Sequence, residues 1–143
     1  MENNLINILM ETDPEKLARK AREDVEIQRL SELFNTPFIV TAKALPGERY
    51  SELAGGMMDE DGVVDYAKAY NVNLMVAMEG MVSPDVRNSD LQKHFGCASP
   101  KDLMEKLFNG GEISKIADVV TNLSGYGKDT EKKVKNSSTR TGK

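Results

Sequence analysis

The stretch from Phe38 to Leu45 is the one part of this sequence that has the composition of a β strand, and it limits the folds open to the chain. Its residues, FIVTAKAL, are rich in β-branched side chains, and Pro46 and Gly47 end the run. A lone strand is not stable without a partner. We expect the partner to come from residues 5–10, from a short extended piece near residues 48–50, or from another subunit.

Most of the remaining sequence has a helical pattern. Ser99 followed by Pro100 is typical of a helix start, and the glycine pairs at 55–56 and 110–111 are expected to end helices with positive φ angles. One amphipathic helix over residues 63–82 is predicted from apolar spacings of three and four, in Val63, Tyr66, Ala67, Tyr70, Leu74, Met78 and Met81. The predicted helices span residues 12–34, 48–58, 63–82, 89–96, 99–108 and 112–123.

These patterns predict a mainly α (α+β) fold, a compact bundle of about five to six helices with one small β element near residues 38–45. Residues 1–126 form the predicted helical domain. Residues 127–143 contain six basic and two acidic residues, and Val134 is their one larger apolar side chain. Such a segment buries too little surface to offset the entropy of ordering. We therefore expect a disordered basic C-terminal tail with a charge of +4 on a body with a charge of −8.

Composition argues against several functional classes. The 143 residues have a net charge of −4, which is unusual for a protein that binds nucleic acid or membrane surfaces. No apolar run reaches the roughly 18 residues of a membrane span, and the N-terminus lacks a signal-peptide pattern. The sequence predicts a cytoplasmic protein.

The side chains that carry catalysis or bind metals are sparse. A single His94 and a single Cys97 could form a nucleophile and base, but a surface histidine and a small buried cysteine are the commoner case. The acids at 59–61 lack the alternate spacing of a calcium loop and fit a solvated turn. We predict no catalytic residue, no metal site and no cofactor. A small enzyme that uses Cys97 is the third-ranked functional hypothesis.

Residues 91–108 have the rhythm of a helix-turn-helix, with a glycine in the turn and a capped second helix. A small DNA-binding regulator is therefore the alternative function, with Lys101 and Lys106 contacting phosphates. The second helix also carries Asp102 and Glu105, and this balance of charge disfavours binding in a DNA groove. Two packed helices joined by a tight turn is the preferred interpretation.

The chain has eight methionines, a residue type that suits adaptable apolar surfaces. Met75 and Met81 flank the apolar stripe of the helix at 63–82 and are expected to be partly exposed. For Met78, a place in the core is the favoured alternative. The candidate partner-binding residues are Met57, Met58, Met75, Met78 and Met81.

Four motifs occur in an order that resembles a known family. They are MEGMVSPD at 78–85, DLQKHFG at 90–96, KLFNGGEI at 106–113 and LSGY at 123–126. The XkdN-like phage tail assembly chaperone family has similar steps, Val-x-Pro-Asp-Leu, Leu-Gln-x-x-Phe-Gly, Leu-Leu-x-Pro-Gly-Glu-Ile and Leu-Ser-Gly-Phe/Tyr. The chain is similar over roughly residues 30–126. It departs at residues 109–111, where Asn-Gly-Gly stands in place of the family's Pro-Gly turn.

The resemblance implies a non-catalytic protein from a tailed phage, a prophage or a tailocin cluster. Such chaperones bind the tape measure protein, help to recruit tail tube subunits in the cytoplasm of the bacterial host, and are absent from the mature particle. Many of their genes also encode a second, longer product by ribosomal frameshifting. Self-association is a further expectation, because the first predicted helix is partly polar and the strand lacks an assigned partner.

Overall fold

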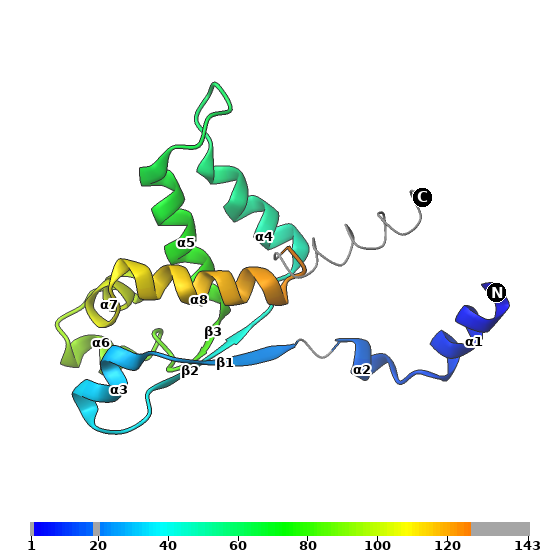
Figure 1. Ribbon diagram of the computed structural model, residues 1–143, viewed down its shortest axis with the longest axis horizontal. Helices are drawn as coiled ribbons and strands as arrows, with labels where there is room; N and C mark the ends of the chain where they lie inside the picture. Colours follow the sequence, from blue (N-terminus) through cyan, green and yellow to red (C-terminus); the bar gives the residue numbers. More distant parts are fainter. Residues whose placement is uncertain (1, 19–20, 127–143) are drawn as a thin grey trace, which may run out of the picture.

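The computed structural model describes residues 2–18 and 21–126, and a small antiparallel sheet covered by helices lies at its centre (Figure 1). The mainly helical α+β class is confirmed, and the predicted tail at 127–143 lies outside the described residues. The described elements are α1 (Glu2–Glu11), α2 (Pro14–Ala18), β1 (Arg22–Glu26), α3 (Gln28–Phe34), β2 (Ile39–Lys43), α4 (Gly47–Ala54), the 3-10 helix η1 (Gly55–Met57), α5 (Tyr66–Gly80), β3 (Met81–Ser83), α6 (Ser89–His94), α7 (Pro100–Leu107) and α8 (Gly110–Leu123).

The predicted strand is β2, the middle strand of a sheet with the order β1-β2-β3. Val40 pairs with Val25 of β1, and Ala42 pairs with Met81 of β3, both in antiparallel register. All four side chains are buried. The expected partner segments were wrong, because residues 5–10 belong to α1 and residues 48–50 belong to α4.

Strand β1 contradicts the predicted helix at 12–34. Four of its five residues are charged and exposed, so the segment has the composition of a helix surface. Val25 and Ile27 are nevertheless both buried, which is the two-residue alternation of a strand, and the ladder to β2 stabilises the extended backbone. β1 lies at an edge of the sheet, and charged side chains are a common protection for such an edge.

Helices α5 and α8 cross each other over the sheet and supply much of the core (Figure 1). The apolar stripe predicted for residues 63–82 was wrong, since Tyr66 is 87% exposed and the helix ends at Gly80. The physical reason is that α5 packs against α8, α7 and α4 together, so its buried side chains do not form a single stripe. They are Val72, Leu74, Val76 and Ala77, with Gly80 at the end of the helix.

The two glycine pairs do not have the predicted role. Gly55 has a right-handed φ of −61° and leads from α4 into η1. Gly110 and Gly111 begin α8 rather than end α7, because Asn109 caps α8 and forms a reciprocal capping box with Glu112. The start predicted at Ser99 and Pro100 is confirmed, since the Ser99 hydroxyl accepts a hydrogen bond from the backbone N–H of Asp102.

Helices α1 and α2 extend away from the body of the molecule (Figure 1). α1 exposes five apolar side chains, and Met10, at 81%, is the most exposed of them. Within the described ranges, no helix is both long enough and apolar enough to cross a membrane.

Candidate functional site

Helix α4, η1, the loop at 58–65 and helix α5 form an arm that projects from the sheet (Figure 1). The loop is closed by an isolated bridge between Met58 and Val64. The Asp59 carboxylate accepts hydrogen bonds from the backbone N–H groups of Asp61, at 2.9 Å, and Val63, at 3.0 Å. Asp59 therefore orders the turn itself, as the interpretation of a solvated turn implies. Gly62 takes the positive φ of +79° that the turn requires.

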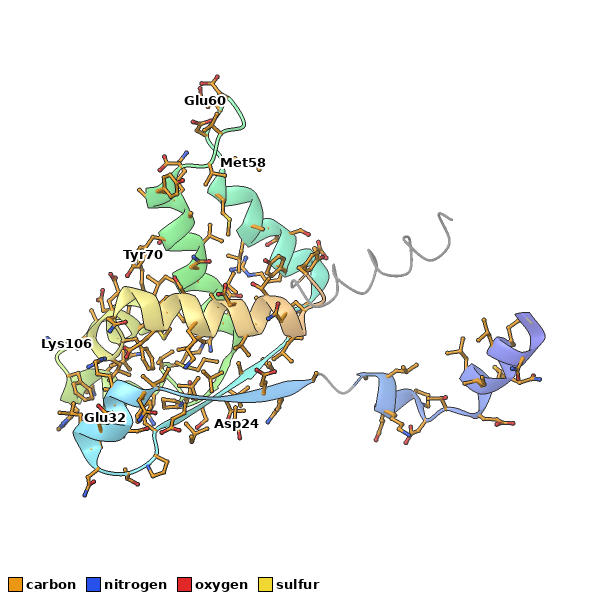
Figure 2. All side chains as sticks on the ribbon, viewed as in Figure 1. Asp24, Glu32, Met58, Glu60, Tyr70 and Lys106 are labelled. Atoms are coloured by element: carbon orange, nitrogen blue, oxygen red, sulfur yellow. The ribbon has the colours of Figure 1, made fainter. Side chains whose placement is uncertain are left out.

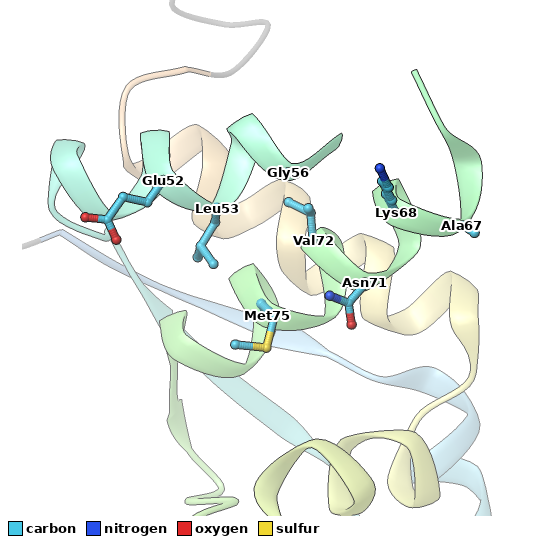
Figure 3. Close-up of a pocket in the computed structure, with 8 residues that line it drawn as sticks. All are labelled: Glu52, Leu53, Gly56, Ala67, Lys68, Asn71, Val72 and Met75. Carbon is cyan, nitrogen blue, oxygen red and sulfur yellow. The ribbon is translucent and has the colours of Figure 1, made fainter. Parts of the chain in front are cut away.

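An open hollow of about 500 Å³ lies between α4 and α5 (Figure 3). Leu53 points into it from α4, and Val72 and Met75 line it from α5. Gly56 and Ala67 are the smallest residues of its lining. The complete lining is Glu52, Leu53, Gly56, Ala67, Lys68, Asn71, Val72 and Met75.

An ion-pair network fixes the base of the arm. Arg49 of α4 donates from Nε to Glu79 Oε1 of α5 at 2.7 Å, and also pairs with Glu52 at 3.0 Å. The Arg49 hydrogen bond lowers the pKa of Glu79 below its ordinary value, although partial burial opposes the shift. Glu52 is thus paired within α4, whereas Lys68 takes part in none of the ion pairs among the described residues.

Exposed apolar side chains also lie in the loop of the arm and on the first turns of α5. Met58 is 55% exposed beside the loop, and Glu60 lies at the tip (Figure 2). Tyr70 donates a hydrogen bond to Glu105 of α7 at 3.2 Å, and its pKa is raised first by partial burial and then by the Glu105 charge. We call this exposed apolar set the tip patch, consisting of Met58, Val63, Val64, Tyr66 and Tyr70.

The predicted methionines do not form one surface. Met75 lines the hollow and Met58 belongs to the tip patch. Met57 and Met78 are half-buried and pack against the core. The expectation that Met81 is exposed was wrong, because Met81 lies in β3 and is only 4% exposed.

The rest of the hollow was missed in the sequence. Leu53 and Val72 looked like ordinary helix positions, and a small residue such as Gly56 or Ala67 gives no local sign that a space lies beside it.

The sequence's other candidates have ordinary surroundings. His94 ends α6 at the surface, and Cys97 is partly buried against the core, as predicted. Across residues 2–18 and 21–126, no group of three or more His, Cys, Asp or Glu side chains is arranged to hold a metal ion. In α7, Leu103 and Met104 are buried, while Lys101 and Asp102 both face solvent. α6 and α7 follow each other closely along the chain, and the charges exposed on α7 are of both signs, which disfavours contact with phosphates.

Comparison with known proteins identifies the family. The sequence profile of the family described as Phage XkdN-like tail assembly chaperone protein matches residues 6–137. The chain belongs to the XkdN-like phage tail assembly chaperone family. The match is longer than the resemblance at 30–126, and it includes residues 6–11 of α1 and the whole arm. Members of this chaperone family are generally non-catalytic.

The fold of this tail assembly chaperone is also similar to a solved structure. The crystal structure of the protein YqbN matches with a TM-score of 0.50 and 20% sequence identity, over 73% of this chain and 86% of that chain. At this identity the likeness concerns the fold alone. Comparison with curated proteins gives no match.

Proposed function

We propose that this chaperone binds the tape measure protein through the hollow between α4 and α5 and through the exposed apolar side chains of the tip patch. The observation that supports the proposal is an open space of about 500 Å³ whose lining includes Leu53, Val72 and Met75. Met58, Val63 and Val64 are exposed in the loop that joins the two sides of the arm. Exposed apolar side chains gathered on one part of a protein are typical of a site for another polypeptide. Methionine side chains adapt to different client helices, and Met75 stands within the hollow.

A client of suitable chemistry is an amphipathic helix that presents apolar side chains at spacings of three and four. A long tape measure protein offers many such segments, so many weak contacts act together and avidity exceeds the affinity of each one.

We further propose that the chaperone helps to recruit tail tube subunits, acts in the cytoplasm of the bacterial host and is absent from the mature particle. Mass spectrometry of purified particles tests the last point.

Co-purification of the chaperone with fragments of the tape measure protein tests the binding site. We expect Ala67→Arg to reduce client binding at least tenfold, because it places a long, charged side chain in the hollow. Ala67 is exposed, so the substitution should leave the core packing unchanged. Leu33→Glu is the matched control, because Leu33 is exposed on α3 and is not among the residues that line the hollow. Equal client binding by both variants and the native chain would contradict the proposed site.

A further inference from the structure

Helix α1 is an apolar surface without a partner in the described part of the chain. Its side chains Leu5, Ile8 and Leu9 recur at spacings of three and four, and Ile6 and Met10 broaden the same face. All five are more than half exposed. A ten-residue helix is only about 15 Å long and is not stable by itself in water, so it needs a surface on which to pack.

The hollow between α4 and α5 has the size and polarity to accept this helix. A cavity left by the truncation of one leucine is about 150 Å³, so a hollow of about 500 Å³ has room for about three such side chains. Leu5, Ile8 and Leu9 supply three. Leu53, Val72 and Met75 provide the apolar lining, as in other complexes of a helix with a groove.

The charges at the two surfaces are complementary. α1 contains no lysine or arginine, and it ends with Glu11. At the hollow, Glu52 is already paired with Arg49, so Lys68 is the lining side chain whose charge is uncompensated by an ion pair in the described residues. An acidic helix end beside Lys68 improves the charge balance of the complex.

We infer that α1 of one copy of this chain occupies the α4–α5 hollow of a second copy, in a head-to-tail contact. Pairing of two α1 helices with each other is disfavoured, because α1 has acidic residues and no lysine or arginine, and such a pair would leave Lys68 of the hollow without an acidic partner. A head-to-tail contact uses two different surfaces, so it leaves one free hollow and one free α1 on every dimer and permits further addition.

This contact also bears on client binding, because it shares the hollow with the proposed function. α1 resembles a client helix in its chemistry, and a neighbouring copy therefore protects the hollow until a client displaces it. The test below contains no tape measure protein, so its failure and the failure of client binding are separate results.

The experiment is light scattering after size-exclusion chromatography of the full chain over a wide range of concentration. We expect the native chain to grow in mass with concentration. Leu5→Asp with Leu9→Asp, which disables α1, and Ala67→Arg, which blocks the hollow, should each weaken association at least tenfold. Asn7→Asp on the polar face of α1 is the control and should associate like the native chain. Thermal melting should be unchanged for the α1 double variant, since α1 lies away from the body (Figure 1).

Mixing the two defective variants decides the geometry. The intact α1 of the Ala67→Arg chain can enter the intact hollow of the α1 double variant, so the mixture should form a one-to-one dimer that grows no further. A native chain that stays monomeric at all concentrations overturns the inference. So does a mixture without dimers, or an Ala67→Arg chain that associates normally by itself.

Discussion

At the residue scale, Gly80 is the position where packing leaves the least room. A Cβ atom at Gly80 would lie 2.6 Å from Val120 Cγ1 and would also meet Val120 Cγ2. The absence of a side chain at Gly80 therefore lets α5 and α8 approach closely where α5 ends and β3 begins.

Gly80→Ala should destabilise the fold by about 1–3 kcal/mol, because the added methyl group overpacks the contact with Val120. Urea denaturation measures the change in the free energy of unfolding. Gly55→Ala is the control, since Gly55 has a helical φ of −61° and nothing within 4 Å of an added Cβ. If Gly80→Ala were as stable as the native chain, α5 and α8 would be able to move apart without a loss in the free energy of unfolding.

Two carboxylates with lowered pKa values link stability to pH. The pKa of Glu79 is lowered mainly by its hydrogen bond from Arg49, and the pKa of Glu112 mainly by that from Arg29. A carboxylate whose folded pKa lies below its unfolded pKa stabilises the fold above the unfolded value of about 4.5 and loses that contribution as the pH falls through the folded value.

Glu79→Gln should therefore lower stability at neutral pH and reduce the loss of stability on acidification below about pH 4.5. Urea denaturation at a series of pH values gives both quantities. Glu60→Gln at the tip of the arm is the control and should follow the native curve. An unchanged acid response in Glu79→Gln would mean that the Arg49 pair contributes nothing to folding.

At the element scale, α8 is the helix whose start is best defined by its own residues. The Asn109 side chain accepts from the backbone N–H of Glu112 at 2.9 Å, and the Glu112 carboxylate accepts from the backbone N–H of Asn109 at 2.9 Å. Arg29 Nη2 also donates a hydrogen bond to Glu112 Oε1 at 2.8 Å, and this bond connects the cap to α3.

Asn109→Ala should lower the free energy of unfolding by about 1 kcal/mol, because it removes half of the capping box. Asn122→Ala near the C-terminal end of α8 is the matched control and should be neutral or slightly stabilising, since alanine has the higher helix propensity. Thermal and urea unfolding compare the two. A neutral Asn109→Ala would indicate that Arg29 holds Glu112 in place without the cap.

Elements with strong local signals were predictable from the sequence, and elements decided by tertiary contacts were not. The β-branched residues of β2 and the Ser99-Pro100 start of α7 act locally, so both were predicted. β1 consists of charged residues that favour a helix in isolation, and it is a strand because it pairs with β2. The hollow depends on how α4 and α5 approach each other, and only Met75 and Met58 of the site were named in advance.

At the scale of the whole molecule, the described body ends at Tyr126, which stacks on Tyr50 of α4 with ring centroids 4.5 Å apart and planes 10° apart. This contact connects the last described residue to the base of the arm. The division into a domain at 1–126 and a basic tail at 127–143 follows from composition and remains a proposal.

Removal of residues 127–143 should leave the melting temperature unchanged, because this segment has too few apolar residues to add to the core. A chain that ends at Gly125 is the comparison, and it should melt lower because it loses the Tyr50–Tyr126 stack, worth about 1 kcal/mol. Differential scanning calorimetry compares the three chains. A fall of more than about 4 °C on removal of 127–143 alone would show that the segment packs on the body.

The charges along β1 have a consequence for a protein that handles sticky clients. Arg22, Glu23, Asp24 and Glu26 are the exposed residues of β1, and β1 is an edge strand of the sheet. Their hydration discourages an extended segment of a client, or of a sister molecule, from joining the ladder and seeding a fibre. Contacts made by helices can be released when a tail is assembled, and a sheet that recruited strands would hold its cargo permanently.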